Sequence, residues 1–512
     1  MKGRFLLGLD AGTSVVKAVL LTEAGATVAA AARRTSFRSP RPGWAEASML
    51  ETWEAAVATI REVLARAQAT GSDVAAIGIT GQMLGAWLID AAGRPVREAI
   101  LWNDGRTQSL IERLSAERPG LMSEIFRFSG CVMQQGCSLP IVRWLSENEP
   151  DVLARAHRIL CSKDWVRFNL TGDLHTDPSD AAVLPGNART QDFEPELFRL
   201  LGVANYRHLF PPLAPSEAVV GSVTVTAART TSLRAGTPVV TGAGDVPAVA
   251  LGAGAVKPGQ ACTILGTTCM NFQVLDQPVF APADVGLLFY VPGHRWLRAF
   301  ANIAGTTNLD WFAEHFCADL VTDTTANGRW AQLEALLTDS PVGARGVLYH
   351  PYLSAVGILA PIYEPTARAQ FLGLSTEHRR ADLMRAVYEG VALAIRDCYA
   401  VLGRPVETIR LSGGGARSEQ WSQLIADCTG SRIEIPSGEE LGAKGAALLA
   451  GTGIGWFTSP LDAAAASAEI ARVHEPLPAN VARYDDIYEV YALIRDQLLP
   501  AWQKRARLEA AI

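Results

Sequence analysis

The chain has 512 residues, of which 49% are hydrophobic and 19% charged, and 46 basic against 52 acidic residues give a formal net charge of −6. This length exceeds the size at which one hydrophobic core stops growing, and the composition is that of a folded protein, so at least two domains are expected. The acidic balance and the scatter of the lysines exclude a basic, nucleic-acid-binding class of protein.

Targeting and metal-binding signatures are missing from the sequence. The N-terminal apolar stretch is short and is broken by Asp10, and the other apolar runs end before a bilayer-spanning length. We therefore expect a cytoplasmic protein without a membrane partner. The eight cysteines form no CxxC motif and the eight histidines no HExxH motif, so reduced, partly buried thiols and no zinc site are predicted.

The chain opens with a predicted hairpin. Phe5–Leu9 and Val15–Leu21 are short apolar runs, and the residues between them are polar. Later in the N-terminal half, periodicity predicts helices over Met49–Gln68, Leu139–Glu147 and Asp164–Leu170, and strands over Val74–Ile79, Trp87–Asp90 and Pro238–Thr241.

The turn of the hairpin has the composition of a phosphate-binding loop. Gly12 lets backbone amides approach phosphate oxygens, the hydroxyls of Thr13 and Ser14 can donate hydrogen bonds, and Lys17 follows shortly after. Asp10, at the end of the strand, can hold hydrated magnesium. An ordinary hairpin turn explains the same residues, so this loop alone leaves both interpretations open.

Two segments of the N-terminal half collect polar groups around an aromatic ring. They are Gly78–Gly85 and Leu101–Arg106. Sugar sites combine an apolar surface for the C–H face of the substrate with polar groups for its hydroxyls. A strand with its turn and a surface loop is the alternative interpretation of these two segments.

Asp245 is the strongest candidate for a catalytic group. It follows the glycine-flanked end of the predicted strand Pro238–Thr241, and open α/β sheets bind ligands at such strand ends. A phosphotransferase needs a carboxylate that accepts the proton of the attacking alcohol. A helix N-cap is the alternative role for Asp245. We place the domain boundary here, with an N-terminal domain of residues 1–250 and a C-terminal domain of residues 251–512.

The C-terminal half repeats the opening pattern. A predicted strand over Cys262–Leu265 is followed by the turn Gly266, Thr267 and Thr268 and a second strand-like run, which suggests two domains of similar fold. Alternating helices and strands then predict layered α/β domains, with helices over Asn308–Cys317, Arg380–Leu402, Glu419–Cys428 and Leu441–Ala450, and strands over Thr408–Leu411 and Arg432–Ile435.

A third glycine loop, Gly413–Gly415, joins a predicted strand to a helix. Each loop alone is weak evidence of function because glycine often joins strands to helices for packing reasons. A nucleotide held by two domains needs several such loops. The sequence contains neither GxxxxGK[ST] nor the HRD and DFG signatures of protein kinases, so ATP would be held in another way.

In this order, the motifs resemble those of the FGGY carbohydrate kinases. The resemblance runs from Gly8 to about Gly455 and rests on the segments GLDAGTS, GQM, ILWNDGRT, GAGD, LGTT, AGTTNLDWF, YEGVALAIRD and GGGARSEQWSQLIAD. Together, so many ordered motifs are highly specific. The resemblance implies an α/β fold of two ribonuclease-H-like domains, of the actin and hexokinase ATPase type, around a deep catalytic cleft.

The resemblance also implies ATP and Mg²⁺ as cofactors, a small-molecule sugar as substrate, and Asp245 as the catalytic base. It implies that Asp10 organises the metal and that Thr267 contacts the transferred end of ATP. The nucleotide-binding positions it predicts are Gly12, Thr13, Ser14, Lys17, Gly266, Thr267, Thr268, Gly305, Asn308, Gly414, Gly415 and Ser418. The substrate-binding positions it predicts are Gln82, Met83, Trp102, Asn103, Asp104, Arg106 and Asp245. Homodimers are common in the family.

Two departures from the family's patterns bear on the substrate. Glycerol kinases have Arg-Glu where this chain has Met83 and Leu84, which makes glycerol a poor candidate. Xylulose kinases have Met-His at these positions and Asn at the position of Val246, so Leu84 and Val246 lack hydrogen-bonding groups that D-xylulose would need.

We therefore predict a ketopentose kinase, with a kinase for erythritol or another polyol as the alternative, since the C-terminal motifs also resemble tetritol kinases. A regulatory ATP-binding relative without catalysis is a remoter alternative, because such a protein would be expected to have lost the carboxylates that this chain retains. A chaperone-like or filament-forming ATPase leaves the sugar-side motifs unexplained.

Overall fold

The computed structural model describes residues 4–184, 186–320, 326–438 and 440–509. The chain forms two compact units, each of mixed helices and strands. The first unit comprises Met1–Val256, Leu275–Leu297 and Glu440–Ala468, and the second comprises Lys257–Val274, Arg298–Glu439 and Glu469–Ile512.

The sheet of the first unit is built around the predicted hairpin. Strand β1 (Phe5–Ala11) pairs antiparallel with β2 (Val15–Leu21) on one side and parallel with β6 (Val74–Gly81) on the other. The strand order is β10-β11-β6-β1-β2-β3, and the short β12 also pairs with β6. The other strands of this sheet are β3 (Thr27–Arg34), β10 (Val219–Ser222), β11 (Pro238–Val240) and β12 (Ala243–Gly244).

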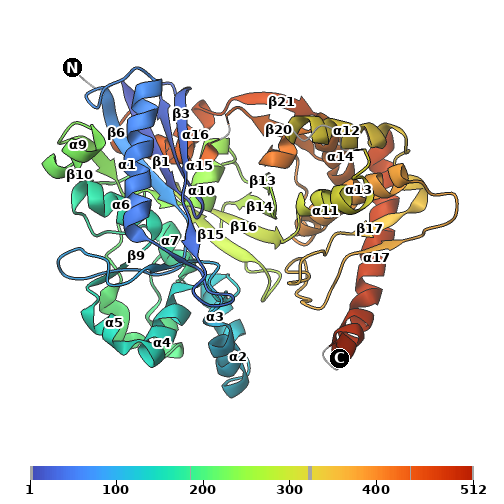
Figure 1. Cartoon of the computed structure of the whole chain (residues 1–512), viewed down its shortest axis with the longest axis horizontal. Coiled ribbons are helices and arrows are strands. Elements are labelled where there is room, and N and C mark those ends of the chain that lie inside the picture. Colours follow the sequence, from blue (N-terminus) through green and yellow to red (C-terminus); the bar gives the residue numbers. More distant parts are fainter. Residues whose placement is uncertain (1–3, 185, 321–325, 439, 510–512) are drawn as a thin grey trace. The chain divides into compact units, whose positions relative to one another are not determined.

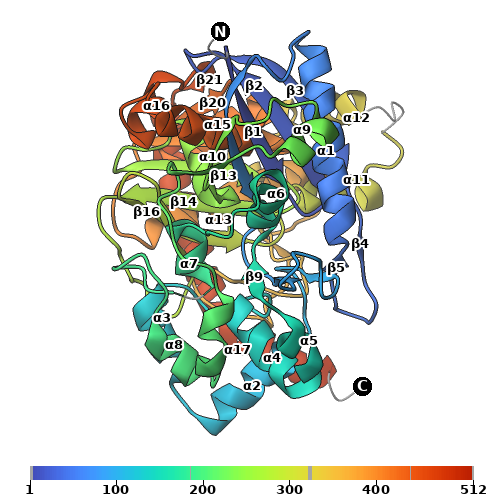
Figure 2. The same cartoon turned by 90° about the vertical axis from the view of Figure 1, so that its left-hand side faces the viewer.

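Helices cover both faces of this sheet, which is why β1 is almost continuously apolar and buried. Helix α1 (Met49–Arg66) packs on β2 and β3, and its first turn is capped by the Ser48 hydroxyl. Helices α10 (Asp245–Ala253) and α15 (Leu441–Gly453) pack together, and α15 lies against β1 and β6. Figure 2 shows α1 on one side of the strands and α10 with α15 on the other.

The α15 side is held by direct backbone packing. A Cβ on Gly8 would lie 1.9 Å from the Ala443 carbonyl oxygen, and a Cβ on Gly78 would lie 1.8 Å from that of Ala446. Only glycine permits so close an approach of a helix to two neighbouring strands. The two strand glycines therefore allow the backbone of α15 to lie directly on the sheet.

The remaining elements of the first unit lie outside this sheet, and several of the helices form a separate group below it in Figure 1. They are β4 (Phe37–Arg38), β5 (Glu46–Ala47), β7 (Trp87–Ile89), β8 (Ala99–Ile100), β9 (Arg158–Leu160), β15 (Leu287–Val291), α2 (Gln108–Glu117), α3 (Leu121–Ser129), α4 (Ser138–Asn148), α5 (Pro150–Arg155), α6 (Ser162–Thr171), α7 (Pro178–Val183), α8 (Pro195–Leu200), η1 (Ala204–Leu209), α9 (Val225–Thr231) and α16 (Pro460–Ala466).

The sheet of the second unit repeats the topology of the first. Strand β13 (Gln260–Leu265) pairs antiparallel with β14 (Cys269–Leu275) and parallel with β19 (Thr408–Ser412), as β1 does with β2 and β6. Beyond β19 follow the parallel β20 (Arg432–Pro436) and the antiparallel β21 (Ile470–His474), which correspond to β11 and β10. The predicted duplication of the fold is thus confirmed.

Helices α13 (Arg380–Ala400) and α14 (Glu419–Thr429) pack together in the core of the second unit. This core contains buried aromatic side chains such as Tyr388 and Trp421. Strand β16 (Arg295–Asn302) passes from the first unit into the second. The other elements of the second unit are β17 (Leu348–His350), β18 (Gln370–Leu372), α11 (Thr307–Phe316), α12 (Ala326–Thr338), η2 (Ala344–Gly346), η3 (Gly414–Arg417) and α17 (Pro478–Glu509).

The predicted strands and helices are all found, with ends shifted by a few residues.

The division of the chain is less simple than the predicted single boundary between residues 250 and 251. The chain returns to the first unit with residues 275–297 and again with α15 and α16, because α15 packs on β1 and β6. Glu439, at the start of the EELGAKGAALLAG motif, lies outside the described residues.

All eight cysteines are free thiols and all are buried, more completely than predicted. Of the helices in the described part of the chain, none has both the length and the apolar composition that a membrane span needs.

Replacing Gly78 with alanine should strongly destabilise the first unit. The new Cβ would overlap the Ala446 carbonyl oxygen, so α15 would have to move away from the sheet, at a cost of about 3 kcal/mol in the free energy of unfolding. Chemical denaturation measures the change. Gly414→Ala is the control, because a Cβ there meets nothing within 4 Å. Equal stability of the two variants would contradict the packing argument.

Candidate active site

Asp10 lies at the end of β1, opposite Lys17 in the hairpin register. Burial raises the pKa of Asp10 to about 6, the positive charge of Lys17 opposes this rise, and the negative charge of Glu440 adds to it. The Lys17 ammonium lies 2.7 Å from Glu440 Oε2, at the start of α15. The end of the hairpin and the start of α15 thus share one cluster of charges.

The Asp10 side chain fits a hydrated divalent cation. Its Oδ1 is buried and accepts no hydrogen bond from any described residue, so it retains a free acceptor. Gly442 lies against Oδ2, where an added Cβ would be 3.0 Å away. Magnesium prefers carboxylate oxygens and water as ligands, and Asp10 offers this donor chemistry.

The Thr13 hydroxyl connects the predicted phosphate loop to the predicted sugar side. It donates to Gln82 Oε1 at 2.9 Å and accepts a hydrogen bond from Trp102 Nε1 at 2.9 Å. Ser14, the next residue, is exposed, and an added Cβ on Gly12 would lie 2.9 Å from the Val15 carbonyl oxygen. The structure therefore brings together residues that the sequence assigned to two different ligands.

Met83 and Leu84 follow β6 on the predicted sugar side. Met83 is buried, and a Cβ on Gly244 would lie 2.5 Å from its Cγ, Sδ and Cε atoms. Leu84 has a left-handed φ of 68°, a conformation that is strained for a residue with a side chain. Trp102 is 44% exposed, while Asn103 Oδ1 is buried and has no hydrogen-bond partner among the described residues. An apolar thioether, an accessible indole and an unused acceptor thus gather at this site.

Asp104 and Arg106 form a buried ion pair. Arg106 Nε and Nη2 donate to the two Asp104 carboxylate oxygens at 2.7 and 2.9 Å, and Nη2 also donates to Glu46 at 2.6 Å. The guanidinium lies 4.0 Å from the centre of the Trp44 ring. The Trp44 and Trp144 rings, 5.3 Å apart, pack edge to face. This ion pair supports the loop that carries Trp102, and the substrate-binding role of Asp104 and Arg106 stays a prediction.

Asp245 is the first residue of α10, and Gly244 before it is the N-cap. The Val246 amide donates to Asp245 Oδ1 at 2.8 Å, so the side chain also satisfies one amide of the first turn. Burial and the negative charges of Asp10 and Asp180 together raise the pKa of Asp245 to about 7, while the hydrogen bond from the Val246 amide opposes this rise.

The sheet register places Asp10 and Asp245 on either side of β6. Asp10 is opposite Thr80 in β6, and Gly244, which precedes Asp245, is opposite Gly81. Two carboxyl groups with raised pKa values therefore lie on the two sides of the carboxyl end of β6. A carboxyl with such a pKa can exchange protons near neutral pH.

The second unit carries two further predicted loops at adjacent strand ends. In the first of these, Gly305 and Thr306 donate to the carbonyl oxygens of Thr267 and Gly266, both at 2.8 Å. A Cβ on Gly305 would lie 2.4 Å from the Gly266 oxygen, so only glycine fits. Asn308 is buried and fixes this arrangement by donating to the Ala304 carbonyl at 2.7 Å.

The second of these loops follows β19, which runs parallel to β13. Gly413 has a left-handed φ of 88°, and a Cβ there would lie 2.5 Å from the Leu265 carbonyl oxygen. Gly414 has open space around it, Gly415 packs on Leu265, and the Ser418 hydroxyl caps α14 by accepting from the Trp421 amide at 2.9 Å. The loops after β13 and β19 thus offer backbone groups side by side.

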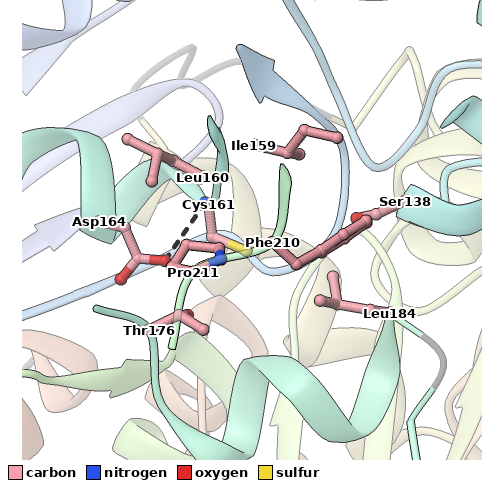
Figure 3. A pocket seen from close by; sticks show the side chains of 9 residues that line it. All are labelled: Ser138, Ile159, Leu160, Cys161, Asp164, Thr176, Leu184, Phe210 and Pro211. Atoms are coloured by element: carbon pink, nitrogen blue, oxygen red, sulfur yellow. Dashed lines mark hydrogen bonds between the residues drawn. The ribbon is translucent and has the colours of Figure 1, made fainter. Parts of the chain in front are cut away.

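One charged cluster near Asp245 was not predicted. It contains Lys163, Asp164 and Arg167 of α6, Asp177 and Asp180, and each of these residues is at most 1% exposed. Its sequence signal was the close spacing of three charged residues in the short segment SKDWVRFNLT. Figure 3 shows a small cavity beside it, lined by Cys161, Asp164 and mostly apolar side chains. Its volume of about 10 Å³ is at the lower limit for one water molecule, so it cannot hold a sugar or a nucleotide.

Comparison with known proteins identifies relatives along nearly the whole chain. The model of the FGGY family of carbohydrate kinases, N-terminal domain, matches residues 5–252, and that of its C-terminal domain matches residues 261–454. The chain is 32% identical to the erythritol kinase of Brucella abortus, over 99% of this chain and 98% of the relative. It is 32% identical to the xylulose kinase of Escherichia coli, over 96% of this chain and 99% of the relative. The crystal structure of xylulose kinase from Rhodospirillum rubrum superposes with a TM-score of 0.86 at 30% identity, covering 98% of this chain and 100% of that one.

Replacing Asp104 with asparagine should destabilise the first unit, because the Arg106 charge would remain buried without its main partner. We expect a loss of about 3 kcal/mol in the free energy of unfolding, measured by chemical denaturation. The matched control is Asp90→Asn, which breaks an exposed ion pair with Arg94 and should leave the denaturation midpoint nearly unchanged. A stable Asp104→Asn protein would show that the ion pair does not support the loop.

Proposed function

The chain belongs to the FGGY family of carbohydrate kinases, and we propose that it transfers the terminal phosphoryl group of ATP to a hydroxyl of a ketopentose, with Asp245 as general base. Kinases of this family are phosphotransferases that act on sugar hydroxyls, and they use ATP. The observation that carries the proposal is the position of Asp245: a carboxyl with a pKa of about 7 next to an apolar, aromatic site and across β6 from Asp10.

In the proposed reaction the ionised Asp245 carboxylate accepts the proton of a sugar hydroxyl. The hydroxyl oxygen forms a bond to the γ-phosphorus of ATP, and the bond from that phosphorus to the β–γ bridging oxygen breaks. The products are a sugar phosphate, ADP and a protonated Asp245, which then loses its proton to solvent. Because the pKa of Asp245 is close to neutral, the residue can both accept and release this proton at physiological pH.

We propose that Asp10 holds Mg²⁺ through coordinated water, using its unpartnered Oδ1. When bound, the ion would neutralise phosphate charge during transfer. Lys17 and the backbone amides of Gly12 to Ser14 are proposed to bind phosphate oxygens. The loops around Gly266 to Thr268, Gly305 and Gly414 to Ser418 are proposed to hold the rest of ATP, mainly through backbone groups, because the Asn308 and Ser418 side chains are occupied.

The side chains at the proposed substrate site favour a molecule with one apolar edge. Gln82 and Asn103 offer polar groups, Trp102 offers an aromatic face, and Leu84 and Val246 offer no hydrogen bond. A substrate hydroxyl facing Leu84 or Val246 would lose its hydrogen bonds to water, at about 1–3 kcal/mol. We therefore place a ketopentose other than D-xylulose first. Erythritol is the second candidate, because a relative with that named activity matches 99% of the chain.

An ADP-release assay across D- and L-xylulose, D- and L-ribulose, erythritol, other pentitols, hexoses and glycerol tests the proposal. We expect one ketopentose or tetritol to be turned over well, and Asp245→Asn to lower kcat about a thousandfold, because an amide cannot accept the proton. Asp90→Asn, a change in a surface turn, is the control. Turnover restricted to hexoses or glycerol would refute the substrate assignment, and full activity of Asp245→Asn would refute the base. ATP hydrolysis without any sugar dependence would instead point to an ATPase.

The same base predicts a pH dependence. Because burial raises the pKa of Asp245 to about 7, the carboxyl is protonated and inactive in acid and ionised above neutral pH. The kcat/KM for sugar should therefore rise about tenfold per pH unit below the pKa and level off above it. Initial rates at saturating ATP measure the profile. A flat profile between about pH 5.5 and about pH 8 would be inconsistent with a base of raised pKa.

A further inference from the structure

The charged cluster of α6 and α7 takes no part in the transfer chemistry proposed above, although five ionisable side chains are almost completely buried there. We name it the Lys163 cluster: Lys163, Asp164, Arg167, Asp177 and Asp180. Burying charges is unfavourable unless they are paired. A group of this size needs a structural or functional reason.

Lys163 lies at the centre of the cluster. Its Nζ is 2.7 Å from Asp164, 3.1 Å from Asp177 and 2.9 Å from Asp180. Burial opposes the charged form of the ammonium, but the three carboxylates outweigh it and hold the pKa of Lys163 well above its ordinary value. The lysine therefore remains a cation and keeps the surrounding carboxylates in fixed positions.

The cluster is not a metal site. The ligand atoms of Cys161, Asp164 and Asp180 lie within 4.8 Å of one another. However, the Lys163 ammonium already lies within ion-pair distance of both carboxylates, and burial raises the pKa of the Cys161 thiol well above its ordinary value. A neutral thiol and carboxylates paired to a lysine are poor ligands for a second cation.

The cluster holds the chain segment that leads to Asp245 at two points. Arg167 Nη1 donates to the Thr241 carbonyl oxygen at 2.6 Å and to Asp164 at 2.8 Å. At the other end, the Gly244 amide donates to Ser179 Oγ at 2.9 Å, and Ser179 Oγ donates to Asp177 Oδ2 at 2.7 Å. Every residue in these contacts is buried.

We propose that the Lys163 cluster positions the general base: Lys163 fixes Asp177, Asp177 fixes Ser179, and Ser179 fixes the backbone immediately before Asp245. Ser179 and Asp177 are positioning residues that act through the Gly244 amide. The inference rests on the proposed role of Asp245. Proton transfer needs a base within hydrogen-bond distance of the substrate hydroxyl, and a displacement of about 1 Å can lower the rate about a hundredfold.

The chain provides a matched pair of serines for the test. Ser179 and Ser216 are both buried, and both donate to the same oxygen of Asp177, each at 2.7 Å. Only Ser179 also accepts the Gly244 amide. Replacing either serine with alanine removes one hydrogen bond to Asp177, but only Ser179→Ala breaks the connection to the base.

The experiment compares kcat, KM for sugar and ATP, and thermal stability for Ser179→Ala, Ser216→Ala and Asp245→Asn on the best substrate of the panel. We expect Ser179→Ala to lower kcat between about tenfold and about a hundredfold with both KM values within about twofold of wild type. Ser216→Ala should keep kcat within about twofold, although it loses the same bond to Asp177. Equal kcat losses in the two alanine variants, or an unchanged kcat in Ser179→Ala, would overturn the proposal.

Two further variants keep the result interpretable. Ser179→Thr retains the hydroxyl and should return kcat to near the wild-type value. If Ser179→Ala does not fold, Ser179→Cys replaces the hydroxyl with a weaker hydrogen-bonding group of similar shape; a wild-type kcat in that protein would overturn the proposal. The outcome for Asp245→Asn separates the two hypotheses: if that variant stays active, the proposed base is wrong, whereas if it is inactive while Ser179→Ala is normal, only the positioning role is wrong.

Discussion

The burial of negative charge at the end of β6 is the constraint on which the first unit depends. Asp10 and Asp245 flank this strand end, and burial raises both pKa values, to about 6 and about 7. The folded protein therefore binds protons more tightly than the unfolded chain, so these groups favour folding most in acid and progressively less as the pH rises from about 4 towards 7. At neutral pH the positive charge of Lys17 offsets part of this cost at Asp10, and the Val246 amide offsets part of it at Asp245.

The two sheets share one topology, but their first hairpins, β1 with β2 and β13 with β14, end in different kinds of residue. In the first unit, Asp10 and Lys17 are opposite each other where the hairpin ends, so charge is concentrated there. The corresponding hairpin of the second unit ends with Leu265 opposite Cys269, and its turn offers Gly266 and the carbonyl oxygens that hold Gly305. One fold thus provides a charged strand end in one unit and a neutral, backbone-lined strand end in the other.

Much of the fold could be predicted because its signals are local. Apolar runs mark β1, β11 and β13, a glycine follows β13 and β19 directly, and helical periodicity marks α1 and α13. The motif positions also indicated Asp10 and Asp245. The contacts that could not be predicted join residues far apart in the chain: Thr13 with Gln82 and Trp102, and Ser179 with Gly244. No local pattern records such pairs, and the buried ion pair of Asp104 with Arg106 was likewise not predicted, while their role in substrate binding stays a prediction.

Met83, proposed to bind substrate, packs on Gly244, which directly precedes the proposed base Asp245. A side chain at residue 244 would overlap Met83, so the glycine allows the turn after β6 to approach the backbone that carries Asp245. Leu84, next in this turn, is held with a left-handed φ, a strain that persists only where the surrounding contacts fix it. Substitutions at Leu84 would therefore change more than the surface that faces a sugar: they would alter the strain in the turn and, through Met83, the support of Gly244. Under the proposed roles of Leu84 and Asp245, specificity and catalysis would share one set of contacts, and a change of substrate would require compensating changes on both sides of the Met83–Gly244 contact.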